Sequence, residues 1–246
     1  MAGLRAFYDG EIPNSGASLR LNPDESRHLV RALRVRPGEK VELLNGMGAR
    51  ISTVFECEVQ KMAELKVEKV TSEAKSSVEI TLIQGLPKGK TFDSIIRQAT
   101  EIGVHRIIPL MSDYSEVRLD SARAENKRAH WQTTAREACK QCGNPWLPEI
   151  SMPMKLKSVL GGLFDDSTRI VASLQPGSVQ IIERSDLLRK ASSVVIAIGP
   201  EGDFSEAEYS LLSEHSFHPV KLARQILRSD TAATYLLSIV EALTAH

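Results

Sequence analysis

The spacing of apolar positions changes several times along the chain. Runs of apolar and β-branched residues that predict strands lie at 78–84, 106–111, 169–174, 194–198 and 218–222. Patterns with a period near 3.6 predict helices at 91–102, 121–142 and 155–160, and from 229 or 230 onward. Strands that alternate with helices in this way predict an α/β domain, in which helices cover a parallel sheet.

The first 74 residues follow a different pattern. Short strand-like runs lie at 41–44, 51–59 and 65–70, and a single helix is predicted at 23–33. We therefore expect a small β-rich domain here. The stretch 71–77 is polar and holds no apolar residue larger than alanine, so it is the natural domain boundary. We accordingly divide the chain into residues 1–74 and 75–246.

One stretch, residues 194–228, organises the second domain. Its apolar run stops at Gly199-Pro200-Glu201-Gly202, and Ser205 with Glu208 forms the capping-box pattern of a helix start. Sheets of this class bind ligands where a strand ends and a helix begins. A second turn, 222–228, precedes the last helix and could flank the same pocket. Neither turn matches a dinucleotide or phosphate-loop motif, and a lone glycine-proline turn is often only a turn.

Composition narrows the classes of function. The 246 residues include 31 Lys and Arg and 31 Asp and Glu, so no overall field attracts nucleic acid. Any contact with RNA must come from local basic patches. No apolar run approaches the ~18 residues of a membrane span, and MAGLRAFYDG lacks the apolar region of a signal peptide. We expect a cytoplasmic protein with no membrane segment.

The cysteines do not indicate a metal or redox site. Three of them, an odd number, argue against a disulfide framework. Cys139 and Cys142 form a C-x-x-C pair, but no second pair exists, and a zinc site requires four ligands. Trp131, Ala135, Ala138 and Cys142 recur at helical spacing, which favours an apolar helix face. We expect no metal.

Two groups of basic residues near the predicted helix starts are candidates for contact with RNA. Arg27, Arg31 and Arg34 fall at spacings of four and three, so in a helix they share one face and could contact successive phosphates. Lys88 and Lys90 lie in a flexible loop before the helix at 91. Solvated surface charge is the alternative for both groups.

The long helix at 121–142 carries a third basic group. Arg128, Gln132, Arg136 and Lys140 lie at intervals of four, opposite the apolar face, and form a basic stripe along one side. This stripe is a further candidate RNA track.

The last helix is apolar nearly all round over residues 232–243. It must therefore be buried on more than one side. A second subunit could supply part of that cover.

The order of several segments resembles one family. IGPEGDFSEAE followed by LARQILRSDTA resembles the C-terminal signature of the SPOUT-class RNA methyltransferases, and more narrowly of the ribosomal RNA small-subunit (uracil-N3-)methyltransferase family. The segments RHLVRALRVRPGEKVELLNG, LPKGKTFDSIIRQATEIGVHRIIPL and AREACKQCGNPWLPEI agree with that family too. The resemblance implies a trefoil-knotted SPOUT domain, preceded by a small PUA-like β-barrel domain that binds RNA. It also implies a homodimer.

The resemblance implies the chemistry as well. The cofactor would be S-adenosyl-L-methionine, and the methyl acceptor would be a uracil N3 in 16S ribosomal RNA, free or in the small ribosomal subunit. The family's cofactor loops correspond to Leu174, Gln175, Pro176, Ile198, Gly199, Pro200, Glu201, Gly202, Leu222, Ile226 and Leu227. Gly202 is expected to use a positive φ. Arg228 would stabilise a substrate phosphate or a uracil oxygen, and would be the catalytic residue.

The sequence departs from the family pattern at several positions. Asp203 stands where a second glycine is common, Gln225 and Asn144 where arginine is usual, Ala223 in place of glycine and Asp230 in place of glutamate. The loss of a guanidinium at Gln225 keeps a second hypothesis open, namely an RNA-binding protein of the same fold without turnover. A related SPOUT enzyme that acts on transfer RNA is the third.

Overall fold

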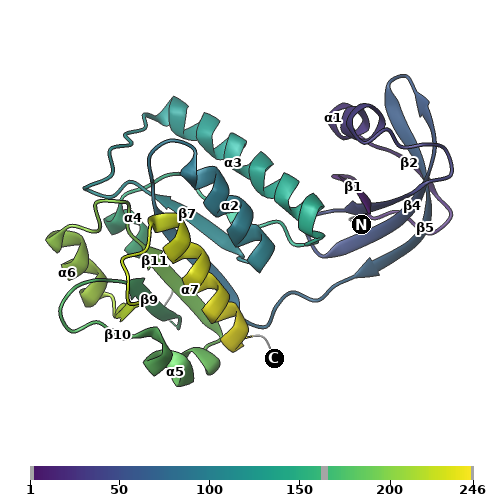
Figure 1. Cartoon of the computed structure of the whole chain (residues 1–246). Helices are drawn as coiled ribbons and strands as arrows, with labels where there is room; N and C mark the ends of the chain where they lie inside the picture. Colours follow the sequence, from purple (N-terminus) through teal and green to yellow (C-terminus); the bar gives the residue numbers. More distant parts are fainter. Residues whose placement is uncertain (1–2, 162–165, 245–246) are drawn as a thin grey trace. The chain divides into compact units, whose positions relative to one another are not determined.

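The computed structural model describes residues 3–161 and 166–244. The chain forms two compact units, one of Met1–Lys75 with Arg136–Leu147 and the other of Ser76–Ala135 with Pro148–His246 (Figure 1). The division predicted from the sequence, residues 1–74 and 75–246, puts residues 136–147 in the second domain. The structure assigns this segment to the first unit, where Cys139 packs against Phe7 and Leu44 in a small apolar cluster.

The first unit is built on one mixed sheet of five strands. The strands are β1 (Leu4–Phe7), β2 (Ser18–Arg20), β3 (Lys40–Leu44), β4 (Ala49–Val59) and β5 (Met62–Ser72), and they pair in the order β1-β3-β4-β5-β2. β1 runs parallel to β3, and the other pairs are antiparallel. In the described residues β1 and β2 are the edge strands. The three longer strands were predicted; β1 and β2 were too short to show a period.

The helix predicted at 23–33 is shorter and changes type. α1 (Pro23–Arg27) begins after Asn22, whose side chain accepts a hydrogen bond from the Glu25 amide. A π-helical turn, His28–Ala32, follows it. Arg34 lies beyond the turn with φ of 56°, in the left-handed region. The prediction that Arg34 continues one α-helical face is therefore wrong.

The second unit contains a seven-stranded sheet. Its strands are β6 (Glu79–Gly85), β7 (Arg106–Leu110), β8 (Glu149–Ile150), β9 (Thr168–Ala172), β10 (Val179–Gln180), β11 (Ser193–Ile198) and β12 (His218–Lys221). They pair in the order β10-β12-β9-β11-β6-β7-β8, and every pairing is parallel. The predicted parallel α/β sheet is confirmed. β8 and β10 have two residues each, too few for a recognisable pattern.

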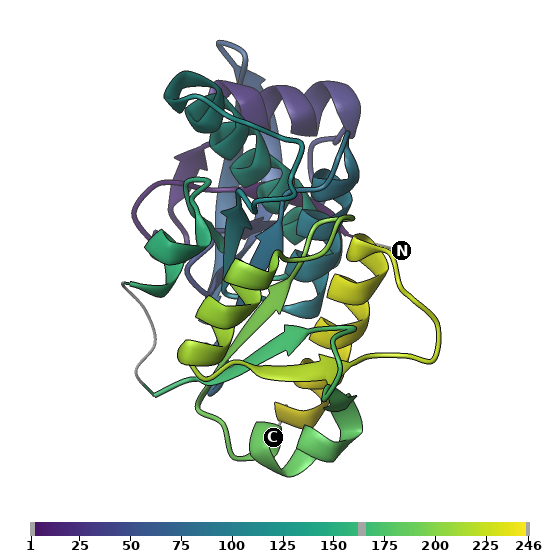
Figure 2. The same ribbon diagram turned by 90° about the vertical axis from the view of Figure 1, so that its left-hand side faces the viewer.

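Helices cover both faces of this sheet. They are α2 (Thr91–Ile102), α3 (Ser121–Cys142), α4 (Leu156–Leu160), α5 (Ser185–Arg189), α6 (Glu206–Glu214) and α7 (Ser229–Thr244). α7 packs against α2, α5 and β11, whereas α4 and α6 pack on alternate side chains of the strands, such as Val195 and Ala197. Figure 2 shows α6 and α7 on opposite faces of the sheet.

The apolar face of α7 is covered within the chain. Leu236, Leu237 and Val240 are at most 1% exposed in the single chain, so burial on more than one side is confirmed. Within the single chain this cover comes from α2, α5 and β11. The trefoil knot stays a prediction.

Candidate functional site

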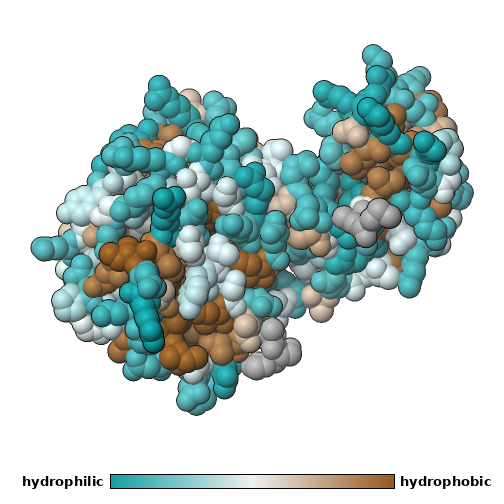
Figure 3. Space-filling model, in the orientation of Figure 1, coloured by the Kyte–Doolittle hydropathy of each residue, from teal (hydrophilic) through white to brown (hydrophobic). Residues whose placement is uncertain are grey.

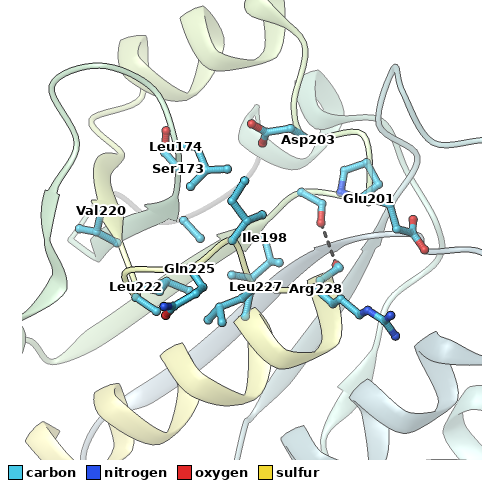
Figure 4. Close-up of a pocket in the computed structure, with 17 residues that line it drawn as sticks. Ser173, Leu174, Ile198, Glu201, Asp203, Val220, Leu222, Gln225, Leu227 and Arg228 are labelled. Atoms are coloured by element: carbon cyan, nitrogen blue, oxygen red, sulfur yellow. Dashed lines mark hydrogen bonds between the residues drawn. The ribbon is translucent and has the colours of Figure 1, made fainter.

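A cavity of about 300 Å³ lies where the central parallel strands end. Three loops form it, those that follow β9, β11 and β12, together with the start of α7 (Figure 4). The carboxyl ends of neighbouring parallel strands meet at one edge of a sheet, which explains why loops distant in sequence converge here. Its lining residues are Ala172, Ser173, Leu174, Ile198, Gly199, Pro200, Glu201, Asp203, Val220, Leu222, Ala223, Gln225, Ile226, Leu227, Arg228, Ser229 and Ala232.

Most of the residues assigned to cofactor binding from the sequence line this cavity. Leu174, the segment Ile198 to Glu201, Leu222, Ile226 and Leu227 do so, and Arg228 stands beside them. Gln175, Pro176 and Gly202 are not among the lining residues. Ser173, Val220 and Ser229 also line the cavity but were not assigned from the sequence. Each lies one or two residues from an assigned residue, so slightly longer loop segments would have included them.

The loop after β11 passes very close to the end of β6. A Cβ atom added to Gly85 would lie 2.4 Å from the Pro200 nitrogen and 2.8 Å from the Gly199 carbonyl carbon. β6 and β11 are paired neighbours, with Gln84 opposite Ile198, so the chain leaves both strands side by side. Only glycine at position 85 leaves room for this path. Gly85 is therefore part of the site although it contributes no side chain.

A chain of hydrogen bonds joins the two main loops. The side-chain nitrogen of Gln84 donates to Ser229 Oγ at 2.8 Å. Ser229 Oγ in turn donates to the Gly199 carbonyl at 2.8 Å, the bond drawn as a dashed line in Figure 4. Gln84 is fully buried and its Oε1 atom has no partner among the described residues. Because a buried polar group is costly when its bonds are broken, this chain fixes the distance between the loop after β11 and the start of α7.

The capping box predicted for the helix after the first turn is confirmed. Ser205 Oγ accepts from the Glu208 amide, and Glu208 Oε2 accepts from the Ser205 amide. The left-handed residue in this turn is Asp203, with φ of 65°, and not Gly202 as expected. Aspartate tolerates this conformation better than most residues because its short side chain hydrogen-bonds locally, as the bond from the Phe204 amide to Asp203 Oδ1 shows.

Two residues with opposite charges, Glu201 and Arg228, line the cavity. Figure 4 shows the Glu201 carboxylate and the Arg228 guanidinium extending to the same side, away from Val220 and Leu222. Glu201 Oε1 accepts a hydrogen bond of 3.1 Å from the Lys88 amide, which ties the preceding loop to the site. Arg228 is exposed and marks the start of α7, where its carbonyl accepts from the Ala232 amide.

The cavity suits S-adenosylmethionine in size and lining. Its volume lies at the lower end of the range of small-molecule sites, and apolar side chains with backbone groups form most of its walls. Ile198, Leu222 and Leu227 present apolar surface that an adenine ring can contact. The loop amides and carbonyls nearby can bond to its polar edge.

The basic residues assigned to RNA contact have different surroundings. Arg27 and Arg31 are exposed and line a shallow groove with Asp24, His28 and Ala32. Arg34 is exposed but lies beyond this groove. The Lys88 ammonium pairs with Glu116 at 2.7 Å. Lys90 is the residue that precedes α2.

The basic stripe on α3 is not a free surface. The side chain of Arg128 donates to the Ile150 carbonyl, and that of Gln132 donates to the Pro148 carbonyl. Arg136 pairs with Asp9 at 2.8 Å and stacks over the Phe7 ring.

Lys140 is buried, at 7% exposure, and its ammonium lies 3.2 Å from Glu25. The prediction that Lys140 contacts RNA is therefore wrong. The helical spacing was correct, but ion pairs and packing hold this face of α3.

The three cysteines, Cys57, Cys139 and Cys142, form no disulfide. Trp131, Ala135 and Ala138 of the predicted apolar face are buried, which confirms that part of it. Cys142 is exposed instead, and Cys139 is buried against Phe7. Burial raises the pKa of the Cys139 thiol to about 12, so it stays protonated. Within 3–161 and 166–244 there is no group of three His, Cys, Asp or Glu side chains placed to hold a metal ion.

Comparison with known proteins gives the family. The model of the RNA methyltransferase domain matches residues 74–241, and that of the RNA methyltransferase PUA domain matches residues 21–72. Ribosomal RNA small subunit methyltransferase E of Bacillus subtilis is 30% identical over 226 residues, which cover 88% of this chain and 87% of the relative. The protein of the same name from Synechocystis is 29% identical over 92% of this chain and 74% of the relative.

Solved structures agree. A putative methyltransferase from Legionella pneumophila with bound S-adenosylmethionine superposes with a TM-score of 0.89 at 27% identity, over 98% of both chains. Ribosomal RNA small subunit methyltransferase E from Neisseria gonorrhoeae, also bound to S-adenosylmethionine, gives a TM-score of 0.88 at 26% identity, again over 98% of both chains. The chain described here belongs to the RNA methyltransferase family that includes the ribosomal RNA small subunit methyltransferases E.

Proposed function

We propose that this protein transfers the methyl group of S-adenosylmethionine to N3 of a uracil in 16S ribosomal RNA. The observation that carries the proposal is the cavity formed by the loops after β9, β11 and β12. Its walls fit the cofactor bound by the Legionella and Neisseria relatives. A relative's name that specifies the small-subunit RNA supports the choice of substrate.

The reaction needs little covalent chemistry from the protein. When bound, S-adenosylmethionine supplies an electrophilic methyl group on a sulfonium. The uracil N3 carries a weakly acidic proton, and its lone pair becomes available when that proton leaves. The protein therefore orients two substrates, excludes water and stabilises the negative charge that develops on the uracil oxygens. We assign the last task to Arg228, which is exposed and lines the cavity.

A methylation assay tests the proposal. Small ribosomal subunits and transfer RNA from a strain that lacks this gene would each be incubated with the purified protein and S-adenosylmethionine. We expect 3-methyluridine, detected by mass spectrometry of digested nucleosides, in the ribosomal RNA alone. Product in the transfer RNA would favour the related SPOUT activity. Cofactor uptake in calorimetry without any methylated nucleoside would favour an RNA-binding protein without turnover.

We propose that the first unit binds the RNA through its arginine-lined groove. Replacing Arg27 and Arg31 by alanine should weaken RNA binding and reduce the slope of log affinity against log salt by about 1 to 2. The reason is that the variant contacts fewer phosphates, so its binding releases fewer counterions. Lys66→Ala with Lys69→Ala is the matched control, since these exposed lysines lie on β5 and outside the groove. Fluorescence anisotropy over a salt series measures both slopes. If the two double variants had the same slope of log affinity against log salt, the groove would not be part of the surface that binds RNA.

We also propose that the protein is a cytoplasmic homodimer. Figure 3 shows apolar surface gathered over the second unit. The exposed apolar or aromatic side chains of this unit include Ile226 at 79%, Leu174 at 55% and Tyr235 at 43%. A second copy of the chain is the partner that would cover these side chains. The molar mass in light scattering distinguishes a dimer from a monomer.

In the part of the chain that the structure describes, no helix is long and apolar enough to cross a membrane.

A further inference from the structure

Asp203 is held in one orientation at the edge of the cavity. Its Oδ1 atom accepts two hydrogen bonds of 2.8 Å, one from the Phe204 amide and one from the Tyr209 hydroxyl. Tyr209 comes from α6, which follows the loop after β11. Burial, reinforced by the Asp203 charge, raises the pKa of Tyr209, so the hydroxyl stays protonated and remains a donor. The carboxylate is therefore held both by its own loop, through Phe204, and by α6, through Tyr209.

The second oxygen of Asp203 is free to meet a ligand. Both hydrogen bonds end on Oδ1, and in the described residues Oδ2 has no hydrogen-bond partner. Asp203 is half-buried and lines the cavity. Figure 4 shows its carboxylate directed toward the loop of Ser173 and Leu174, away from Glu201 and Arg228.

The charges that line the cavity favour a cation. Its ionisable lining residues are Glu201, Asp203 and Arg228, which sum to one net negative charge. Glu201 and Arg228 carry opposite charges and extend to the same side in Figure 4, so together they add no net charge to the cavity. Asp203 is then the charge left unbalanced, and its partial burial reduces the screening by solvent.

We propose that Asp203 is a specificity-determining residue that makes the site prefer the cationic cofactor to the neutral product, an inference that rests on the proposed function. S-Adenosylmethionine carries a sulfonium, whereas methyl transfer leaves the electron pair of the carbon–sulfur bond on sulfur. The product S-adenosylhomocysteine is therefore a neutral thioether at that atom. The carboxylate attracts the cofactor and loses this attraction once the methyl group has gone, which favours product release.

The test compares three ligands on two proteins by titration calorimetry. Asp203→Asn keeps the size, the tolerance of positive φ and an acceptor oxygen, but removes the charge. We expect it to lower the affinity for S-adenosylmethionine about tenfold, and that for the amine analogue sinefungin by a similar factor, while S-adenosylhomocysteine binds within about twofold of wild type. The preference for the cations should also shrink for the wild type in high salt, and a thermal melt checks that the variant is folded.

Two controls separate charge from positioning. Tyr209→Phe removes the anchor and keeps the charge, so it should affect all three ligands similarly. Asp203→Gly also suits the left-handed backbone and removes the charge, so it should repeat the asparagine result if that variant is unstable. Equal losses for cofactor and product in Asp203→Asn, or no loss for either, would overturn the inference. If the wild type bound neither ligand, the proposed function itself would fail.

Discussion

Gly85→Ala will abolish S-adenosylmethionine binding while leaving the protein folded. The added methyl group would lie 2.4 Å from the Pro200 nitrogen and 2.6 Å from Pro200 Cδ, distances at which something must move. The obstructing atoms belong to a proline and to the Gly199 backbone, so no flexible side chain can turn aside. The loop after β11 must then shift, and with it the part of the cavity wall formed by Gly199 and Pro200.

The affinity should fall at least about 100-fold, because a loop moved by a fraction of an ångström no longer presents its backbone groups to the ligand. The free energy of unfolding should fall by only about 1–3 kcal/mol, the usual result of overpacking one methyl group. Titration calorimetry measures the first quantity and denaturant unfolding the second. The loop follows the carboxyl end of β11 and is not part of the sheet, so β6 and β11 should stay paired.

Gly89→Ala is the matched control for this substitution. Gly89 lies four residues later in the following loop, and nothing lies within 4 Å of a Cβ atom added to it. Its φ of 66° means that alanine costs about 1 kcal/mol in backbone strain without displacing the loop after β11. If Gly85→Ala bound the cofactor as tightly as Gly89→Ala, the close approach would have no role in binding.

The features predicted well from the sequence are those set by neighbours along the chain. The strand ending at Ile198 and the capping box of Ser205 with Glu208 depend on residues within one short stretch, and both are confirmed. The predicted helix at 91–102 is α2, which ends at Ile102 and is capped by Gly103 with φ of 99°.

The features that escaped prediction depend on partners far along the chain. Gly85 matters because strand pairing places it beside Pro200, and no local pattern indicates that register. From the sequence Lys140 is expected to be an exposed cation, but in the fold it is buried and pairs with Glu25, 115 residues away. Arg34 leaves the helix because α1 gives way to a π-helical turn. Period and spacing describe a helix face, but they do not say what the folded chain packs against it.

Arg228→Ala should lower kcat about 100-fold without changing the affinity for S-adenosylmethionine. The guanidinium lies at the rim of the cavity on an exposed side chain. Its backbone is fixed because the next residue, Ser229, hydrogen-bonds the Gly199 carbonyl. Loss of one donor to a developing oxyanion typically costs a factor of 10² to 10³ in kcat. Arg228→Lys should recover part of the rate, since the charge remains but the paired donors do not.

Arg224→Ala provides the matched control, since Arg224 is exposed on the same loop and does not line the cavity. Steady-state methylation measured over a series of small-subunit concentrations gives kcat and KM for the RNA. A loss in kcat alone means that Arg228 stabilises the uracil oxygen in the transition state, because an interaction made only there does not change ground-state binding. A rise in KM for RNA at constant kcat would assign Arg228 to a substrate phosphate, an interaction equally strong before and during methyl transfer. Measuring kcat and KM therefore distinguishes the two roles that the sequence leaves open for Arg228, stabilising a uracil oxygen and binding a substrate phosphate.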